Sequence, residues 1–116
     1  MSLHNTQAND IAPLAILKNL SYLNLRDTEV SDLRPLANLN QLRWLWLEDT
    51  QVTDVAPLAT LPNLKYLYLN NTPISDVSPL KNATALVDLN LNNTRVDEKS
   101  IEYLKTALPQ CQISLP

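Results

Sequence analysis

The sequence lacks the residues on which many ligand-binding and catalytic motifs depend. Glycine and phenylalanine are both absent from its 116 residues. Glycine permits close backbone approach to a ligand, so its absence argues against phosphate-binding loops and related motifs. A single cysteine, Cys111, excludes an internal disulfide, and the single histidine, His4, lies near the opposite end of the chain. No zinc spacing or Cys–His dyad follows from that pair, and we predict neither an enzyme nor a cofactor.

Charge and hydropathy exclude two further classes of partner. The net charge of −3 provides no long-range attraction to nucleic acid. No stretch approaches the roughly 20 apolar residues that a membrane-spanning helix needs. Residues 1–7 also lack the basic segment and apolar run of a signal peptide. We therefore expect neither nucleic-acid binding nor membrane insertion.

What the sequence does contain is a strict repeat, marked by Leu20, Leu42, Leu64 and Leu86 at one constant interval. Other residue types keep the same interval, in the columns Thr6, Thr28, Thr50, Thr72 and Thr94; Asp10, Asp32, Asp54 and Asp76; and Pro13, Pro35, Pro57 and Pro79. A fixed period in the low twenties is typical of a solenoid. Each unit is too small to bury its own apolar residues, so it buries them against its neighbours.

Each repeat is predicted to form a strand, a bend and a short helical turn. Leu45 and Leu47 alternate with Trp46, which is strand periodicity and places the leucines on one face and the tryptophan on the other. Asp54 then stands where a helix N-cap is expected, and Pro57 fits the first turn. Parallel stacking of such units places the strands on the concave side and the helical turns on the convex side.

The repeated pattern resembles a known family. It reads Leu20-x-x-Leu23-x-Leu25-x-x-Thr28-x-Val30-x-Asp32-Leu33-x-Pro35-Leu36-x-x-Leu39, with copies from Leu42 and Leu64. This resembles bacterial leucine-rich repeat proteins, and its length and Asp-Leu-x-Pro-Leu segment resemble the internalin-type subclass. The resemblance implies an α/β fold: a right-handed solenoid with a parallel β-sheet on the concave face, short 3-10 or helical turns on the convex face, and a C-terminal capping helix. It also implies a secreted or cell-surface location.

We divide the chain as one leucine-rich repeat domain, 1–116. It comprises a partial first repeat (1–19), three full repeats (20–41, 42–63 and 64–85) and a last strand plus C-terminal cap (86–116). Leu3 aligns with Leu25, and Thr6 with Thr28, so the chain is expected to open in the middle of a repeat and to be part of something longer.

The two ends of the stack are expected to differ. Residues 97–108 are predicted to form a longer helix, and residues 107–113 a closing segment over the apolar end. No equivalent N-terminal cap is predicted, so Ile11, Leu14 and Leu17 should line a partly exposed apolar edge. We expect either fraying of the first residues or an end-to-end dimer through this edge.

Five of the six aromatic residues occupy outward-facing strand positions: Tyr22, Trp44 and Tyr66 in one column, Trp46 and Tyr68 in the next. Exposed aromatic clusters usually mark interaction sites, although cross-strand packing also explains them. We predict that the concave face binds a macromolecular partner, preferably a protein. The predicted binding residues are Tyr22, Asn24, Arg26, Trp44, Trp46, Glu48, Tyr66, Tyr68 and Asn70, with Arg26 and Glu48 providing polar specificity.

Two other functions stay open. Flat rings also stack on sugars, and Asn24, Asn70 and Asn90 offer hydrogen bonds, so the face could bind glycans. Alternatively, the chain is a structural spacer segment of a longer bacterial surface protein. The aspartate ladder suggests calcium, but that ion needs six to eight oxygen ligands, and helix capping accounts for the carboxylates. We predict no metal site.

Overall fold

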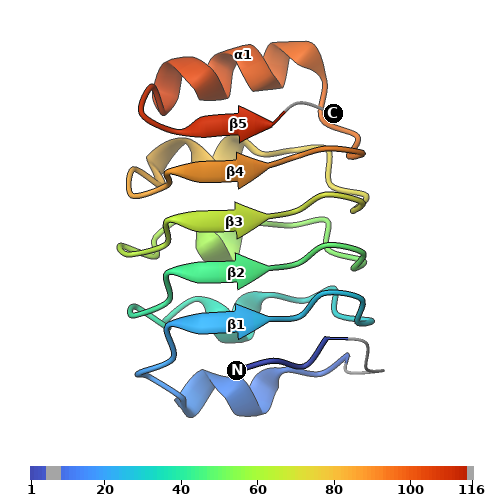
Figure 1. Cartoon of the computed structure of the whole chain (residues 1–116), viewed down its shortest axis with the longest axis vertical. Coiled ribbons are helices and arrows are strands. Elements are labelled where there is room, and N and C mark those ends of the chain that lie inside the picture. Colours follow the sequence, from blue (N-terminus) through green and yellow to red (C-terminus); the bar gives the residue numbers. More distant parts are fainter. Residues whose placement is uncertain (5–8, 115–116) are drawn as a thin grey trace.

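The computed structural model describes residues 1–4 and 9–114. One layer of the fold is a parallel five-stranded sheet whose strands follow chain order (Figure 1). The strands are β1 (Tyr22–Asn24), β2 (Trp44–Trp46), β3 (Tyr66–Tyr68), β4 (Asp88–Asn90) and β5 (Gln112–Ser114). The first four pair in the register of the sequence repeat, with Leu23 opposite Leu45, Leu45 opposite Leu67 and Leu67 opposite Leu89. The predicted parallel sheet is confirmed.

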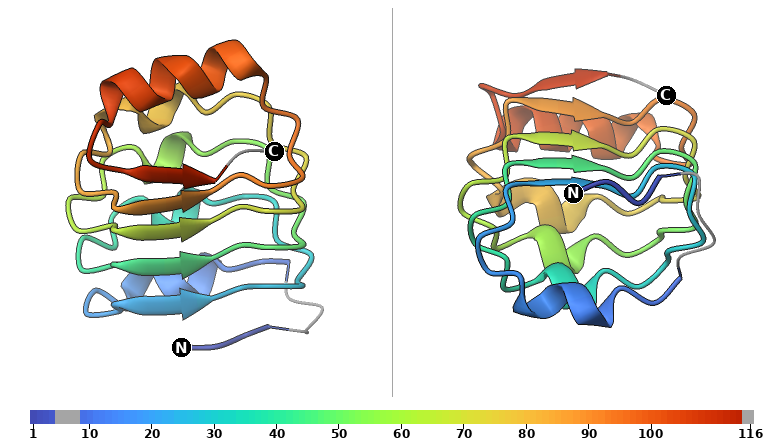
Figure 2. Two further views of the ribbon diagram at one scale, coloured as in Figure 1. Left: turned by 45° about the horizontal axis from the view of Figure 1, so that its top comes forward. Right: turned by 60° about the horizontal axis from the view of Figure 1, so that its bottom comes forward.

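Short 3-10 helices form the second layer, on the opposite side of the stack from the strands (Figure 2). They are η1 (Ala12–Ile16), η2 (Arg34–Leu36), η3 (Ala56–Leu58) and η4 (Ser78–Asn82). Each carries a proline at its first or second position, where a missing backbone N–H is tolerated. The predicted arrangement of strand, bend and helical turn is confirmed.

The aspartate column serves these helices, but from one position earlier than predicted. Val55, not Asp54, is the N-cap residue of η3, because its carbonyl accepts the first hydrogen bond of the turn, from Leu58 at 2.9 Å. The Asp54 carboxylate instead accepts from the backbone N–H of Ala56 at 2.9 Å. This is an Asx turn. The same bond joins Asp10 to Ala12, Asp32 to Arg34 and Asp76 to Ser78.

The turns that follow the strands require left-handed backbone without glycine. Four equivalent residues supply it, with φ between 57° and 61°: Asp27, Asp49, Asn71 and Asn93. Aspartate and asparagine tolerate this region best after glycine. The neighbouring threonine stabilises the turn, since the Thr50 hydroxyl donates to the carbonyl of Leu47 at 2.7 Å. Thr28, Thr72 and Thr94 make the same bond, to Leu25, Leu69 and Leu91, so these threonines bond within their own repeats.

The core is a continuous stack of apolar side chains, most of them leucines, between the two layers. Leu45 and Leu47 are both fully buried, whereas the tryptophans on either side of Leu45 are not. The predicted inward and outward alternation of the strands is confirmed.

The C-terminal end is covered by α1 (Glu98–Ala107), as predicted. Asp97 caps it by accepting a hydrogen bond from the backbone N–H of Ser100 at 2.8 Å, and Ile101 and Leu104 face the core. The closing segment after the helix does more than cover the core. It forms β5, which the sequence did not predict, with Ile113 opposite Leu89. Its residues lie outside the repeat period, because Gln112 follows its partner Asp88 by more than one repeat.

At the other end, residues 1–3 lie along β1. Ser2 forms a parallel bridge with Asn24, and backbone bonds run from Leu3 to Asn24 at 2.8 Å and from Asn24 to Met1 at 2.9 Å. Leu3 thus occupies the register position expected from its alignment with Leu25. The alignment of Thr6 lies outside the described residues.

The predicted apolar edge is wrong for two of its three residues. Ile11 and Leu14 are 3% and 8% exposed, because η1 turns them into the positions that Leu33 and Leu36 take one repeat later. Leu17 is half-buried, and the exposed large apolar residues at this end are Ile16, at 78%, and Met1, at 52%. The end-to-end dimer stays a prediction.

Candidate binding site on the strand face

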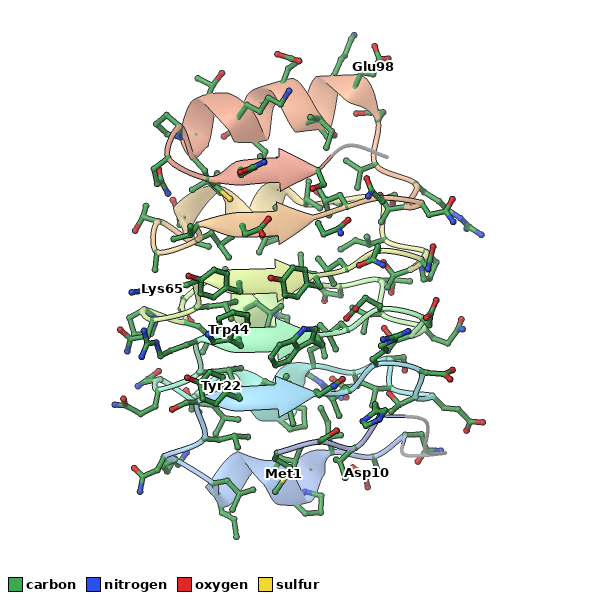
Figure 3. All side chains as sticks on the ribbon, in the orientation of Figure 1. Met1, Asp10, Tyr22, Trp44, Lys65 and Glu98 are labelled. Carbon is green, nitrogen blue, oxygen red and sulfur yellow. The ribbon has the colours of Figure 1, made fainter. Side chains whose placement is uncertain are left out.

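The outward side of the sheet, here called the strand face, carries the predicted site. Strand register continues the two aromatic columns across it. One column reads Tyr22, Trp44, Tyr66, Asp88 and Gln112; the next reads Asn24, Trp46, Tyr68, Asn90 and Ser114. Figure 3 shows Tyr22 and Trp44 on neighbouring strands of this face. We call the five rings, Tyr22, Trp44, Trp46, Tyr66 and Tyr68, the aromatic patch.

The five rings pack into one cluster with Trp44 at its centre. Trp44 stacks on Tyr66 with ring centroids 3.9 Å apart and on Trp46 at 5.4 Å. Tyr22 meets Trp44 edge to face at 6.1 Å, and Trp46 lies nearly parallel to Tyr68 at 6.1 Å. Each such pair adds about 0.5–1.5 kcal/mol beyond the area that it buries. The rings are therefore held in place before any ligand arrives.

Packing leaves the rings less open than the sequence suggested. Tyr22 is 49% exposed, but the other four are half-buried because they cover one another. Cross-strand packing and surface presentation are thus both features of the patch. The exposed portions of the rings lie side by side on a single face.

Glu48 follows β2 at the edge of the patch, and one of its oxygens is unsatisfied. Its side chain is half-buried, and no described residue donates a hydrogen bond to its buried Oε1. Burial raises the pKa of Glu48, and Asp49 adds to the rise, while the backbone amide of Glu48 and the charge of Arg26 oppose it. A buried acceptor without a donor is unfavourable and uncommon in native proteins.

A second carboxylate borders the patch from the next strand. Asp88 stands opposite Tyr66 in the sheet and is half-buried. Burial raises the pKa of Tyr68, and so do the charges of Asp88 and Glu48 and the neighbouring Tyr66. Tyr68 therefore lies between two acidic groups. Sequence reasoning missed Asp88, although its place one full repeat after Tyr66 was the signal that could have found it.

The predicted polar residues have different environments. Asn24 is half-buried, and its Oδ1 accepts a hydrogen bond from the backbone N–H of Arg26 at 3.0 Å. Asn90 makes the same bond to Asn92 at 2.9 Å. These amide oxygens support the backbone and are already occupied. Arg26 is exposed and Asn70 half-buried on the strand face.

Metal binding, membrane spanning and a reactive cysteine were also considered for the described part of the chain. Within residues 1–4 and 9–114, no group of three or more histidine, cysteine or acidic residues is placed to hold a metal ion. No helix among those residues is long and apolar enough to span a bilayer. Burial raises the pKa of the Cys111 thiol to about 11, with a smaller contribution from Asp88, so the thiol is a poor nucleophile.

Comparison with known proteins defines the class. The family described as Leucine Rich repeats (2 copies) matches residues 40–82 and again residues 62–106. These ranges cover more than half of the chain, which therefore belongs to the leucine-rich repeat proteins. This repeat fold is usually non-catalytic and typically binds proteins. No curated protein matches the chain.

Two internalins of Listeria monocytogenes are similar in both structure and sequence. The inlF internalin superposes with a TM-score of 0.91 and 33% identity over 97% of this chain. Internalin C2 gives 0.83 and 31% over 97%. A leucine-rich repeat protein of Leptospira interrogans gives 0.90 over 99% of this chain at 23% identity, which shows the shared fold alone. The chain spans 33%, 48% and 30% of these three proteins.

Proposed function

We propose that this chain is a protein-interaction module that binds its partner through the aromatic patch. The observation that supports the proposal is the gathering of both tryptophans and three of the four tyrosines on one face of a rigid sheet. Tryptophan and tyrosine dominate the binding energy of protein interfaces. An extended surface of five rings also suits a macromolecule better than a small molecule, which needs an enclosed pocket.

The rigidity of the patch favours tight binding. Each strand carries its rings in fixed register, and the rings contact one another. Side chains that are already ordered lose little conformational entropy when a partner binds. Arg26 and Glu48, one repeat apart at the ends of their strands, supply opposite charges for specificity.

The glycan alternative is weaker because its hydrogen-bonding groups are partly engaged. Sugar recognition needs amide and carboxylate groups free to meet hydroxyls around a stacked ring. The oxygens of Asn24 and Asn90 are instead bonded to the backbone N–H groups of Arg26 and Asn92. A glycan array run beside the protein-binding screen separates the two functions.

A peptide selection tests the proposal without a known partner. Short random peptides displayed on phage are selected on the parent protein, and the enriched peptides are then titrated against variants. We expect Trp46→Ala to weaken binding about 30-fold, since a central interface aromatic is worth about 2 kcal/mol or more.

Tyr103→Ala is the matched control. Tyr103 is the one aromatic residue outside the patch, lies on α1 and is 53% exposed, so its removal should leave peptide affinity unchanged. Circular dichroism shows whether each variant is folded. Peptides that bind Trp44→Ala and Trp46→Ala as well as the parent would contradict the proposal, as would sugar binding with no peptide enrichment. If the selection enriches no peptide and the array shows no bound glycan, the result would favour the spacer alternative.

A further inference from the structure

We propose that the protein partner presents an acidic side chain to Arg43 and Lys65, which border the aromatic patch where its strands begin. The inference rests on the function proposed above and adds the charge of the partner and the side of the patch on which that charge lies. Two features of the structure support it. The charges around the strand face are segregated by sign, and these two cations have no charged partner among the described residues.

Positive charge lies on one side of the strand face, where the strands begin. Because the strands are parallel, their starts all lie along one edge of the face and their ends along the other (Figure 1). The loops that lead into the strands, here called the entry side, comprise residues 17–21, 37–43, 59–65, 83–87 and 108–111. These loops contain Lys18, Arg43 and Lys65 and no acidic residue, and Lys81 lies just before one of them, in the last turn of η4. The entry side therefore carries only positive charge.

Negative charge dominates the opposite side, where the strands end. The loops that follow the strands, here called the exit side, comprise residues 25–33, 47–55, 69–77 and 91–97. They contain two arginines, Arg26 and Arg95, and eight acidic residues: Asp27, Glu29, Asp32, Glu48, Asp49, Asp54, Asp76 and Asp97. Arg34, at the start of η2, pairs with Asp32 at 2.7 Å and so neutralises one of the eight. The aromatic patch thus lies between a positive and a negative side, and such a pattern orients a partner of complementary charge.

Arg43 and Lys65 connect the positive side to the rings. They immediately precede Trp44 and Tyr66, whose rings form the closest stacked pair of the patch, with centroids 3.9 Å apart. The backbone N–H of Lys65 donates to the carbonyl of Arg43 at 2.9 Å. The two residues therefore stand side by side where β2 and β3 begin, at the usual strand spacing of about 4.8 Å.

Both cations are available to another molecule. Arg43 is exposed, and the Lys65 side chain extends beyond the start of β3, away from the rings (Figure 3). Neither makes a side-chain hydrogen bond or an ion pair with any residue that the structure describes. Two long side chains that begin this close together can meet at one carboxylate on the border of the patch. An apolar side chain next to that carboxylate would then lie on the rings.

Asp88, on β4, reduces the positive charge beside Lys65. It is half-buried, and its backbone N–H donates to the carbonyl of Lys65 at 3.1 Å. Arg43 lies one strand further from Asp88, and its own backbone N–H donates to the carbonyl of Ser21, an uncharged residue, at 2.8 Å. Arginine also binds a carboxylate through two parallel hydrogen bonds, whereas the lysine ammonium acts as a point charge. Arg43 should therefore contribute more than Lys65.

An acidic protein segment fits this pattern better than a polyanion such as a sulfated glycan. A polyanion carries negative charge along its whole length, so any part of it that crosses the patch approaches the negative exit side and is repelled. A protein segment can instead place one acidic side chain at the entry side and uncharged or basic side chains across the rest of the face. It can therefore use the rings and the two cations together.

Intrinsic fluorescence provides the test, because the only two tryptophans of the chain, Trp44 and Trp46, both belong to the patch. The probes are the capped peptide acetyl-Leu-Leu-Glu-Glu-amide and its analogues with two glutamines or two lysines in place of the glutamates. We expect a saturable change with the glutamate peptide, affinity about fivefold lower for the glutamine peptide, and the weakest binding for the lysine peptide. In about 0.5 M salt, which screens exposed charges, the glutamate and glutamine peptides should bind alike.

Variants locate the effect. Arg43→Gln should weaken binding of the glutamate peptide about threefold and Lys65→Gln about twofold, while both leave binding of the glutamine peptide unchanged. Arg95→Gln is the matched control, because it removes an exposed arginine from the exit side and should have no effect. Equal binding of the glutamate and glutamine peptides at low salt, unaltered binding by Arg43→Gln, or no saturable response would each overturn the inference. Heparin that displaces the glutamate peptide and binds more tightly through Arg43 would overturn it in favour of a polyanion.

The peptides selected on phage separate this inference from the function on which it rests. Enrichment of an acidic residue next to an apolar one, with affinity reduced in both Arg43→Gln and Trp46→Ala, supports both. Peptides that need Trp46 but lack an acidic residue and bind Arg43→Gln normally would overturn the acidic inference and leave protein binding intact. Acidic peptides that need Arg43 but bind Trp44→Ala and Trp46→Ala as well as the parent would overturn the proposed interface instead.

Discussion

Replacing Leu47 with alanine should lower the free energy of unfolding by about 2–5 kcal/mol. Leu47 is 0% exposed and stands between Leu25 and Leu69 in one column of the core. Backbone bonds from Leu25 to Trp46 and from Leu47 to Tyr68, both 2.9 Å, hold the three repeats in register. The neighbouring leucines therefore cannot close the cavity, and we expect a loss in the upper half of the range.

The magnitude is large relative to the whole fold. A domain of 116 residues has a total stability of roughly 6–17 kcal/mol at about 0.05–0.15 kcal/mol per residue. Leu47→Ala should thus shift the urea midpoint far below that of the parent, measured by circular dichroism with a common slope.

Tyr22→Ala is the matched surface change. Tyr22 is exposed and makes one edge-to-face contact, with Trp44, which corresponds to about 0.5–1.5 kcal/mol. Trp46→Ala should be intermediate, because Trp46 is half-buried and stacks on two rings. If Leu47→Ala costs no more than Tyr22→Ala, the inward and outward assignment of the strands is inverted.

Three further predictions concern the Asx turns, the half-buried Glu48 and the N-terminal edge. Asp54→Asn should be nearly neutral, because asparagine can keep the Asx turn to Ala56, and Asp54→Ala should cost about 1 kcal/mol in urea denaturation; a calcium-dependent rise in melting temperature that Asp54→Asn abolishes would refute this turn-forming role. Burial raises the pKa of Glu48. Glu48 therefore adds to the free energy of unfolding while it is protonated, and this contribution is lost as pH rises through the raised pKa. The charge of Arg26 opposes this rise in pKa but does not cancel it. Glu48→Gln should therefore raise the melting temperature at neutral pH and raise it much less in acid. An equal rise at both pH values would contradict the prediction. The amides of Leu3 and Asn24 should be protected in hydrogen exchange, since both are bonded at this edge; fast exchange would contradict the pairing. Sedimentation should show dimers that grow with concentration if two copies join there, and a monomer at every concentration would exclude the end-to-end dimer.

The parts of the fold that the sequence predicted are those governed by the same local rule in every repeat. Leucine alternation, the proline in each turn and the long terminal helix each follow from spacing that can be counted. β5 was not predicted, because a helix interrupts the repeat before it and Gln112 follows its partner Asp88 by more than one repeat. The N-cap was predicted at Asp54 but lies one residue later, at Val55. A 3-10 turn closes its hydrogen bonds over fewer residues than an α-helix does, so rules for α-helix caps do not give its first residue.

The candidate site was predictable in position but not in environment. Alternation was enough to place Trp44 and Trp46 on the outward face. It could not show that the rings cover one another, because ring contact depends on side-chain rotamers. Nor could it show that Glu48 is half-buried with a free acceptor, since that depends on the neighbours on both adjacent strands. Asp88 was overlooked because the search followed aromatic residue type along the column instead of the column itself.

The order of the strands also determines how this chain can grow. Each strand from β1 to β4 pairs with a segment exactly one repeat away in the chain, so the loop closed by each new pairing has the same length however many repeats precede it. The entropy of closing a loop depends on that length, and contact order relative to chain length falls as units are added. Inserting one more repeat between β2 and β3 would leave every other pairing span unchanged. Solenoids of this type can therefore lengthen by whole units without a topological penalty, and each added unit extends the binding face by one strand.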